Sequence, residues 1–216
     1  MIITAMEPRR KSLTAVYLDG QLAGEIDCET MLRMHLHIGD VLDDDAWTSL
    51  CAESEIARAK SYAVWLLDRR SYTTGMLRQK MRESHSPAAI DTTLEWVQQI
   101  GLVDDADYAR RYASELVRLR SFSGFRIEQE LMHRGISRDL ARQTVAELAG
   151  EANLPEPCAA IRSLLQGKFA GKYGDEKGRR RTVAALQRMG YRWDNIRTVL
   201  DELSDSPGEI CEPWDN

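Results

Sequence analysis

Histidines and one glycine- and lysine-rich segment are the residues whose types and spacing could support chemistry. His35 and His37 lie two residues apart in a segment with helical character, where side chains at that spacing diverge and make poor joint metal ligands. Gly167 to Gly178 lacks the preceding buried strand and the GxxxxGK(S/T) spacing of a phosphate-binding loop. GxGxxG, HExxH and GxSxG motifs do not occur in the sequence. We therefore expect a protein that is not an enzyme, with no catalytic, metal or cofactor-binding residues.

Carboxylates cluster at two predicted helix starts, Asp43 to Asp45 and Asp104 with Asp105. The positive end of the helix dipole favours acidic groups there, and capping explains them without an acid–base role. The four cysteines are far apart and form no CxxC motif, which indicates neither a zinc site nor a disulfide framework.

Arginine and lysine placement is the clearest positive signal. The whole chain has a net charge of −5, but residues 159–200 carry 10 basic and 3 acidic side chains, and residues 106–148 carry 8 and 6. Guanidinium groups bind carboxylates and phosphates bidentately, so such surfaces suit an acidic protein groove or a nucleic-acid backbone, and arginine count alone does not separate these partners. The candidate partner-binding residues are Arg110, Arg111, Arg118, Arg126, Arg134, Lys168, Lys172, Arg179, Arg180, Arg181 and Arg188.

An N-terminal module of a β-hairpin and a short helix is expected over residues 1–54. Residues 14–18 and 21–26 read as strands around Asp19-Gly20, a strong hairpin signal because a type I′ turn needs positive φ at both central positions. Residues 31–38 are predicted to form a short helix that stops at Gly39. Because one hairpin is not stable alone, this module should dock on the helix that follows.

From Asp43 onward, apolar residues at three- and four-residue steps and regular caps predict helices. A shift of 50 residues places Tyr62 on Tyr112 and Leu66 on Leu116, and a further shift of 55 places Gly135 on Gly190. These superpositions predict three copies of a three-helix unit. One globular bundle with chance self-similarity is the alternative.

The predicted fold is therefore mainly α: an elongated array of three tandem three-helix repeats behind the small N-terminal module. The repeats are placed at residues 55–104, 105–150 and 156–203, an acidic tail at 204–216, and a hinge at Gly150 to Pro157. The longest apolar run, Ala63 to Leu67, is too short to span a membrane, and the start has no export signal. A cytoplasmic monomer with no membrane partner is expected.

The motif from Gly101 to Ala109, Gly-Leu-Val-Asp-Asp-Ala-Asp-Tyr-Ala, resembles the junction of the first two repeats in the RecX family of regulatory proteins. Three further segments fit the family pattern, so the resemblance covers about residues 13–203. They are Tyr62-Ala63 with Leu66-Leu67 and Arg69-Arg70 upstream, Arg126-Ile127 with Glu130-Leu131 and Arg134-Gly135-Ile136-Ser137 downstream, and the hairpin Val16 to Gly20. Ser123-Gly124 stands where the family usually has Gly-Pro, and Met76 where a glutamate is common.

The resemblance implies a non-catalytic regulator that binds the RecA–DNA filament and lowers its ATPase, strand-exchange and co-protease activities in recombination and repair. Single- or double-stranded DNA is a further partner to consider. The alternative is a helix-turn-helix-like DNA-binding module, formed by residues 123–134, the turn at Gly135-Ile136 and residues 138–149.

Overall fold

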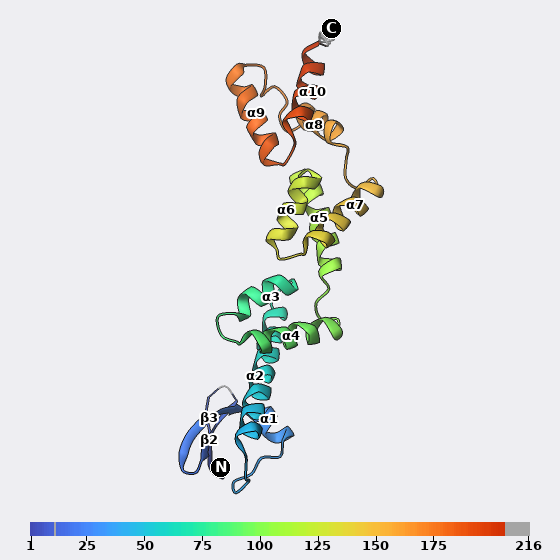
Figure 1. Cartoon of the computed structure of the whole chain (residues 1–216). Coiled ribbons are helices and arrows are strands. Elements are labelled where there is room, and N and C mark those ends of the chain that lie inside the picture. Colours follow the sequence, from blue (N-terminus) through green and yellow to red (C-terminus); the bar gives the residue numbers. More distant parts are fainter. Residues whose placement is uncertain (11, 206–216) are drawn as a thin grey trace, which may run out of the picture. The chain divides into compact units, whose positions relative to one another are not determined.

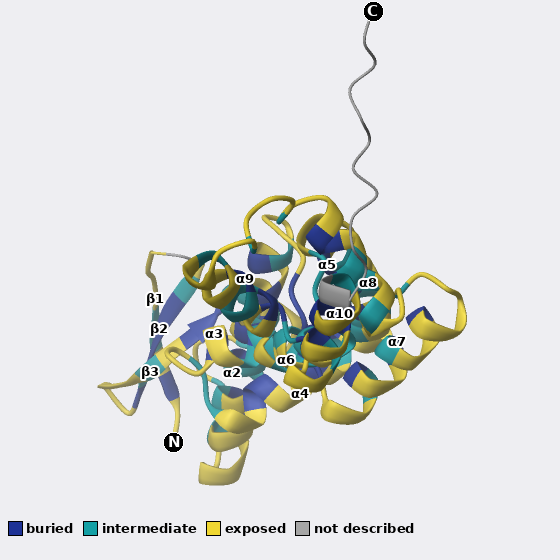
Figure 2. Ribbon diagram, turned by 90° about the horizontal axis from the view of Figure 1, so that it is seen from above, coloured by how far each residue is buried: buried dark blue, intermediate teal, exposed yellow. Residues whose placement is uncertain are grey.

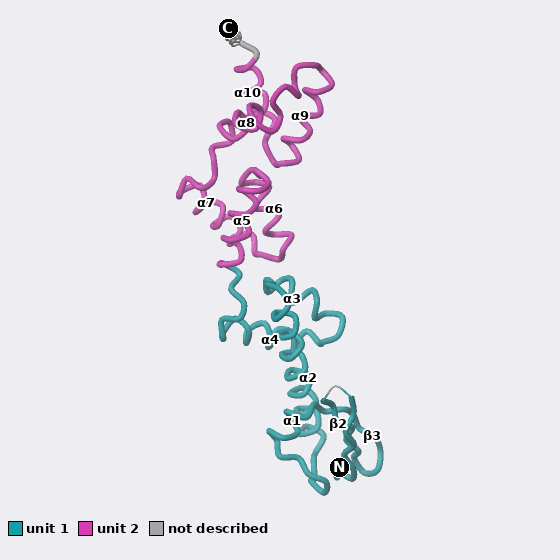
Figure 3. The backbone as a smooth tube through the Cα atoms, turned by 180° about the vertical axis from the view of Figure 1, so that it is seen from behind, with its two compact units in different colours: residues 1–105 teal, residues 106–216 magenta. Residues whose placement is uncertain are grey.

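The structure is a computed structural model that describes residues 1–10 and 12–205. In these residues it contains one three-stranded sheet and ten α-helices (Figure 1), so the mainly helical class is confirmed. The chain divides into two compact units, residues 1–105 and residues 106–216 (Figure 3). Residues 206–216, most of the predicted acidic tail, lie outside the described residues.

The sheet is antiparallel in the order β1-β2-β3, with β1 at Ile3–Pro8, β2 at Leu13–Leu18 and β3 at Gln21–Asp27. The predicted hairpin is confirmed, because Leu18 pairs with Gln21 and leaves Asp19 and Gly20 as a two-residue turn with φ of 51° and 82°. The prediction of only two strands is wrong, since β1 pairs along β2. Ile3 is the one fully buried residue of β1, so the strand carries little apolar pattern.

Helix α1 covers Cys28–Arg33 rather than the predicted residues 31–38. The side chain of Asp27 accepts a hydrogen bond from the Thr30 N–H at 3.0 Å and so starts the helix earlier. The backbone of His35 adopts a positive φ of 49°, which ends the helical path before Gly39. His37 therefore lies outside any helix, and the helical segment predicted for the two histidines was wrong.

Helix α2, Asp44–Leu67, contributes to two cores. The carboxylate of Asp43 accepts from the Ala46 N–H at 2.7 Å, which confirms the predicted helix start. Leu50, near the beginning, packs with buried side chains of the sheet, whereas Ala59 and Ala63 pack in the core of the next two helices. The predicted boundary between residues 54 and 55 consequently falls inside one continuous helix.

Three helix triplets follow, each around its own core. The second half of α2 packs with α3 (Thr74–Met81) and α4 (Pro87–Gln99), and Ser86 caps α4. In the second unit α5 (Asp105–Arg120), α6 (Gly124–His133) and α7 (Arg138–Gly150) share a core around Ile127 and Leu131. These separate cores contradict the alternative of one bundle.

The last triplet consists of α8 (Pro157–Gln166), α9 (Glu176–Arg188) and α10 (Trp193–Asp205), around Ile161, Leu186 and Ile196. Helix α10 begins at Trp193 and carries Asp194 in its first turn. In Figure 2, buried residues appear as stripes on helices whose other faces are exposed, the pattern of amphipathic helices that pack on their neighbours. The assignment of the triplets to separate domains stays a prediction.

Asp105 caps a different helix from the one it was expected to serve. Although it is the first residue of α5, its carboxylate accepts hydrogen bonds from the backbone N–H of Thr74 at 2.9 Å and from the Thr74 hydroxyl at 2.5 Å. Thr74 is the first residue of α3, so Asp105 binds an N–H group that has no acceptor within its own helix. The second acid of the Asp104-Asp105 pair therefore joins two helices that are 31 residues apart.

We expect Asp105→Ala to lower the free energy of unfolding by about 1–2 kcal/mol, because both donors of Thr74 lose their acceptor. Urea unfolding followed by circular dichroism measures this loss. Asp139→Ala is the matched control, since Asp139 lies exposed in the first turn of α7 and makes no side-chain hydrogen bond in the described part of the chain. Equal losses in the two variants would contradict the capping role.

Candidate partner-binding surface

Helix α5 brings three of the predicted arginines to one exposed face. Arg110, Arg111 and Arg118 line a shallow hollow together with Ser114 and Glu115. The helix is held in place by its opposite face, where Ala109, Ala113 and Leu116 are buried. This amphipathic division follows from the helical period and directs the guanidinium groups to solvent.

Ion pairing distinguishes the arginines of α5 from one another. Arg111 lies 2.8 Å from the carboxylate of Asp107, one turn earlier on the same helix. Arg110 and Arg118 make no ion pair within residues 1–10 and 12–205. An exposed pair such as Arg111–Asp107 contributes only about 0–1 kcal/mol, so an anionic partner can replace it at little cost. We define Arg110, Arg111 and Arg118 as the α5 arginine row.

Arg126 and Arg134 on α6 are engaged inside the second unit. The guanidinium of Arg134 donates to the hydroxyls of Tyr108 and Tyr112 at 3.4 and 3.3 Å and lies 4.8 Å from the centre of the Tyr112 ring. Arg126 pairs with Glu130 at 2.5 Å. Both arginines are half-buried, so their contacts hold α6 in place, and their role in partner binding stays a prediction.

The remaining candidates lie on α9 and on the loop before it. Lys172 and Arg181 line a second hollow with Phe169 and Asp175, and the Lys172 ammonium donates to the carbonyl of Lys168 at 2.8 Å. Two neighbours of Arg181 are paired with acids: Arg180 with Glu176 at 2.6 Å, and Arg179 with Asp201 at 3.8 Å. Arg188 is exposed near the end of α9. The predicted residues therefore lie on α5, α6, α9 and the loop before α9, and their role in partner binding stays a prediction.

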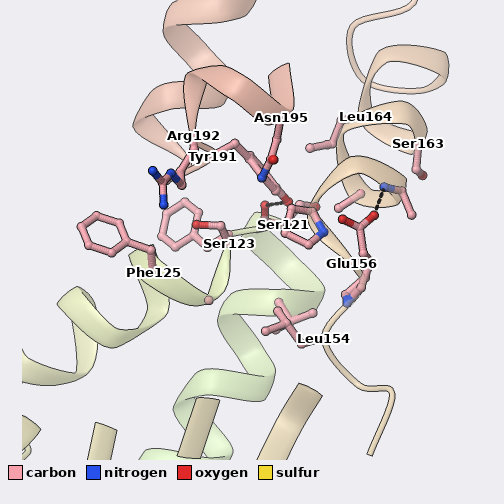
Figure 4. A pocket seen from close by; sticks show the side chains of 18 of the residues that line it. Ser121, Ser123, Phe125, Leu154, Glu156, Ser163, Leu164, Tyr191, Arg192 and Asn195 are labelled. Atoms are coloured by element: carbon pink, nitrogen blue, oxygen red, sulfur yellow. Dashed lines mark hydrogen bonds between the residues drawn. The ribbon is translucent and has the colours of Figure 1, made fainter. Parts of the chain in front are cut away.

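A pocket of about 480 Å³ in the second unit is not among the features predicted from the sequence (Figure 4). The α5–α6 loop, the segment between α7 and α8, α8 itself and the start of α10 form it, and its lining is largely apolar. Phe125, with 64% of its surface exposed, lies beside Arg192 on one side, and Glu156 lies on the other. Backbone N–H groups of Cys158 and Ala159 hydrogen-bond the Glu156 carboxylate and lower its pKa. The signal in the sequence is a pair of phenylalanines, Phe122 and Phe125, within a polar stretch.

Comparison with known proteins connects this fold to a family. Residues 104–145 match a family model described as RecX, second three-helix domain. The chain is 32% identical over 144 residues to the regulatory protein RecX of Trichlorobacter lovleyi, covering 65% of this chain and 92% of that relative. The chain belongs to the RecX family. It is also 26% identical over 202 residues to regulatory protein RecX of Clostridium acetobutylicum, covering 91% of this chain and 92% of the relative.

Solved RecX structures share the fold. A crystal structure of regulatory protein RecX matches with a TM-score of 0.64 at 18% identity, over 93% of this chain and 98% of the other. RecX from Lactobacillus salivarius matches with a TM-score of 0.53 at 17% identity, over 69% and 97%. The resemblance predicted from the motif at Gly101 to Ala109 is thus confirmed. Within the described residues of this RecX-family chain, every helix is too short or too polar to cross a membrane.

Proposed function

We propose that this protein binds the filament that RecA recombinase forms on DNA and lowers its ATPase, strand-exchange and co-protease activities. The relatives are named as regulatory proteins, and family membership makes RecA the partner to test. No chemical step is required of this chain, because binding alone changes the filament if it favours one filament state over another. Such a partner exists in the cytoplasm, where we place the protein.

The α5 arginine row is the observation that carries this proposal. Arg110 and Arg118 are exposed cations without an ion pair in the described part of the chain, and they lie on one face around a hollow. Guanidinium groups in this arrangement can bind carboxylates of a protein partner bidentately. Lys172, Arg181 and Arg188 on the last triplet offer further contacts, and several linked weak contacts raise the effective concentration of each.

Charge reversal of the row tests the proposal. We expect the wild-type protein to lower the ATPase rate of RecA on single-stranded DNA at substoichiometric and at equal ratios. A variant with Arg110→Glu and Arg118→Glu should need about tenfold more protein for the same inhibition, because two attractive contacts become repulsive. Filament binding measured by co-sedimentation should weaken in parallel.

Arg82→Glu with Arg138→Glu is the matched control, since both arginines are exposed, lie outside α5 at the end of α3 and the start of α7, and give the same change in net charge. The control should inhibit like the wild type. Equal weakening in both double variants would show a general charge effect and remove the assignment of the row. No inhibition by the wild type at equal ratio would remove the proposed function itself.

The helix-turn-helix-like alternative involves α6 and α7. Gly135 has a φ of 79° in the turn, and Ser137 caps α7 through the Leu140 N–H at 3.3 Å. Two polar side chains of α7 are bound to carboxylates of this chain, however: Arg142 to Glu128 at 3.2 Å and Gln143 to Glu147 at 2.8 Å. A reader of duplex DNA needs such side chains for base edges. The alternative therefore has weaker support than the filament proposal.

A further inference from the structure

Four planar side chains form a row on the first unit that the proposed function does not use. Tyr62 and Trp65 lie three residues apart on α2, and Arg69 follows four residues later, in the turn after the helix ends at Leu67. The rings of Tyr62 and Trp65 are stacked with centres 5.8 Å apart and an angle of 16° between their planes. The Arg69 guanidinium lies 3.9 Å from the centre of the Trp65 ring, and His85 lies 5.5 Å from Tyr62 on the other side. We call these residues the planar row.

The row is exposed at the end where Trp65 and Arg69 lie. Trp65 keeps 49% of its surface exposed, and Val64 beside it keeps 43%. Tyr62 is half-buried and packs on the core of the first triplet, which fixes the position of the row. Since the core is complete without the indole, stability of this triplet does not explain why a large aromatic ring lies on the surface.

Three arginines lie next to or within the row, beside the acids Asp68 and Glu55. Arg58, Arg69 and Arg70 make no ion pair within residues 1–10 and 12–205. The carboxylate of Glu55, whose charge acts on His85, accepts a hydrogen bond from the Ser86 N–H at 2.7 Å. Burial, and then the charge of Arg58, lower the pKa of His85, so its ring is uncharged near neutral pH. The surface therefore offers planar stacking groups next to cations, which match a chain of bases and phosphates.

We propose that the planar row is a binding site for single-stranded DNA, with bases that stack on Trp65 and on the guanidinium plane of Arg69. Both aromatic rings and arginine planes stack bases, and stacking does not depend on base identity. Arg58, whose charge acts on His85, and Arg70, which follows Arg69 and lies over the Tyr72 ring, are the cations available to bind phosphates. Duplex DNA fits this site poorly, because its bases are already stacked and cannot reach the indole. This binding needs no recombinase, so it goes beyond the proposed function.

Binding of a fluorescein-labelled 20-residue oligodeoxythymidylate to the full chain, measured by fluorescence anisotropy at low salt without recombinase, tests the site. We expect the wild type to bind this strand more tightly than a 20-base-pair duplex. Trp65→Leu and Arg69→Ala should each raise the dissociation constant about fivefold or more. Unlabelled strand should also quench the tryptophan fluorescence of the wild type, and quench Trp65→Leu less.

Trp193→Leu is the matched control, because Trp193 is an equally exposed tryptophan, at 50%, on the second unit. It should bind like the wild type, and circular dichroism should show that all variants keep their helical content. Equal affinities of Trp65→Leu and Trp193→Leu would overturn the site, as would tighter binding of the wild type to duplex. Loss of RecA inhibition in the separate ATPase assay would not affect this result, so the two proposals fail independently.

Discussion

Gly190→Ala should lower the free energy of unfolding of the second unit by about 2–4 kcal/mol. Gly190 has a φ of 91°, a conformation that costs an L-residue about 1–2 kcal/mol. An added Cβ would also lie 2.5 Å from the Cβ of Arg126 and closer still to the hydroxyl of Ser123. Ser123 donates its N–H to the carbonyl of Met189 at 3.0 Å, so neither chain segment can move away without breaking this hydrogen bond. Overpacking of this kind adds about 1–3 kcal/mol.

Urea unfolding followed by circular dichroism measures the effect of Gly190→Ala, and Gly171→Ala is its control. Gly171 belongs to the same unit and has a φ of 68°, but nothing lies within 4 Å of its added Cβ. The control therefore loses only the backbone contribution, about 1–2 kcal/mol. If the two variants lose the same free energy of unfolding, the close contact between the α5–α6 loop and the α9–α10 loop is not what disfavours a side chain at position 190.

The neighbouring Tyr191 should make the second unit sensitive to alkaline pH. Its ring is 6% exposed, and its hydroxyl donates to the carbonyl of Ser121 at 3.0 Å. Burial raises the pKa of Tyr191 from 10 to about 12. Because the folded state holds this proton more tightly than the unfolded state, the stabilisation is complete below pH 10 and is lost as the pH rises to about 12. The loss across this window amounts to about 2–3 kcal/mol.

Unfolding by urea at pH 8 to 11 tests this dependence. At pH 8 Tyr191→Phe should be less stable than the wild type by about 1 kcal/mol, because the carbonyl of Ser121 loses its donor. Above pH 10 the wild type should lose stability faster than the variant, so the difference between them shrinks. Parallel curves for the two proteins over this range would contradict the burial-dependent titration.

The helix triplets could be predicted because their signals are local. Helices begin after the capping residues Ser86 and Ser137, and a turn with positive φ follows a helix at Gly135. Between these signals, apolar residues recur every three or four positions. Strand β1 could not be predicted, since most of its residues are exposed and its pairing partner in β2 decides its conformation. The start of α1 was missed because Asp27 ends a strand and caps a helix at once.

The candidate surface could be predicted only in part. The helical period places the α5 arginines on one face, but it does not show which arginines already have partners. Arg134 is occupied by Tyr108 and Tyr112, which are 26 and 22 residues away in the sequence. Likewise, the planar row depends on His85, which the fold brings to Tyr62 from a loop. Contacts between distant segments require the tertiary structure.

Helix α2 has a consequence for the cooperativity of the first unit. Its beginning completes the core of the sheet through Leu50, and Ser54 accepts a hydrogen bond from the N–H of Asp27 at 2.8 Å. One turn further on, Ala59 enters the core of the first triplet. Fraying of the sheet would expose the middle of a continuous helix, and melting of the triplet would remove the support of the sheet. We therefore expect the two halves to share one unfolding transition, with neither acting as an independent foldon.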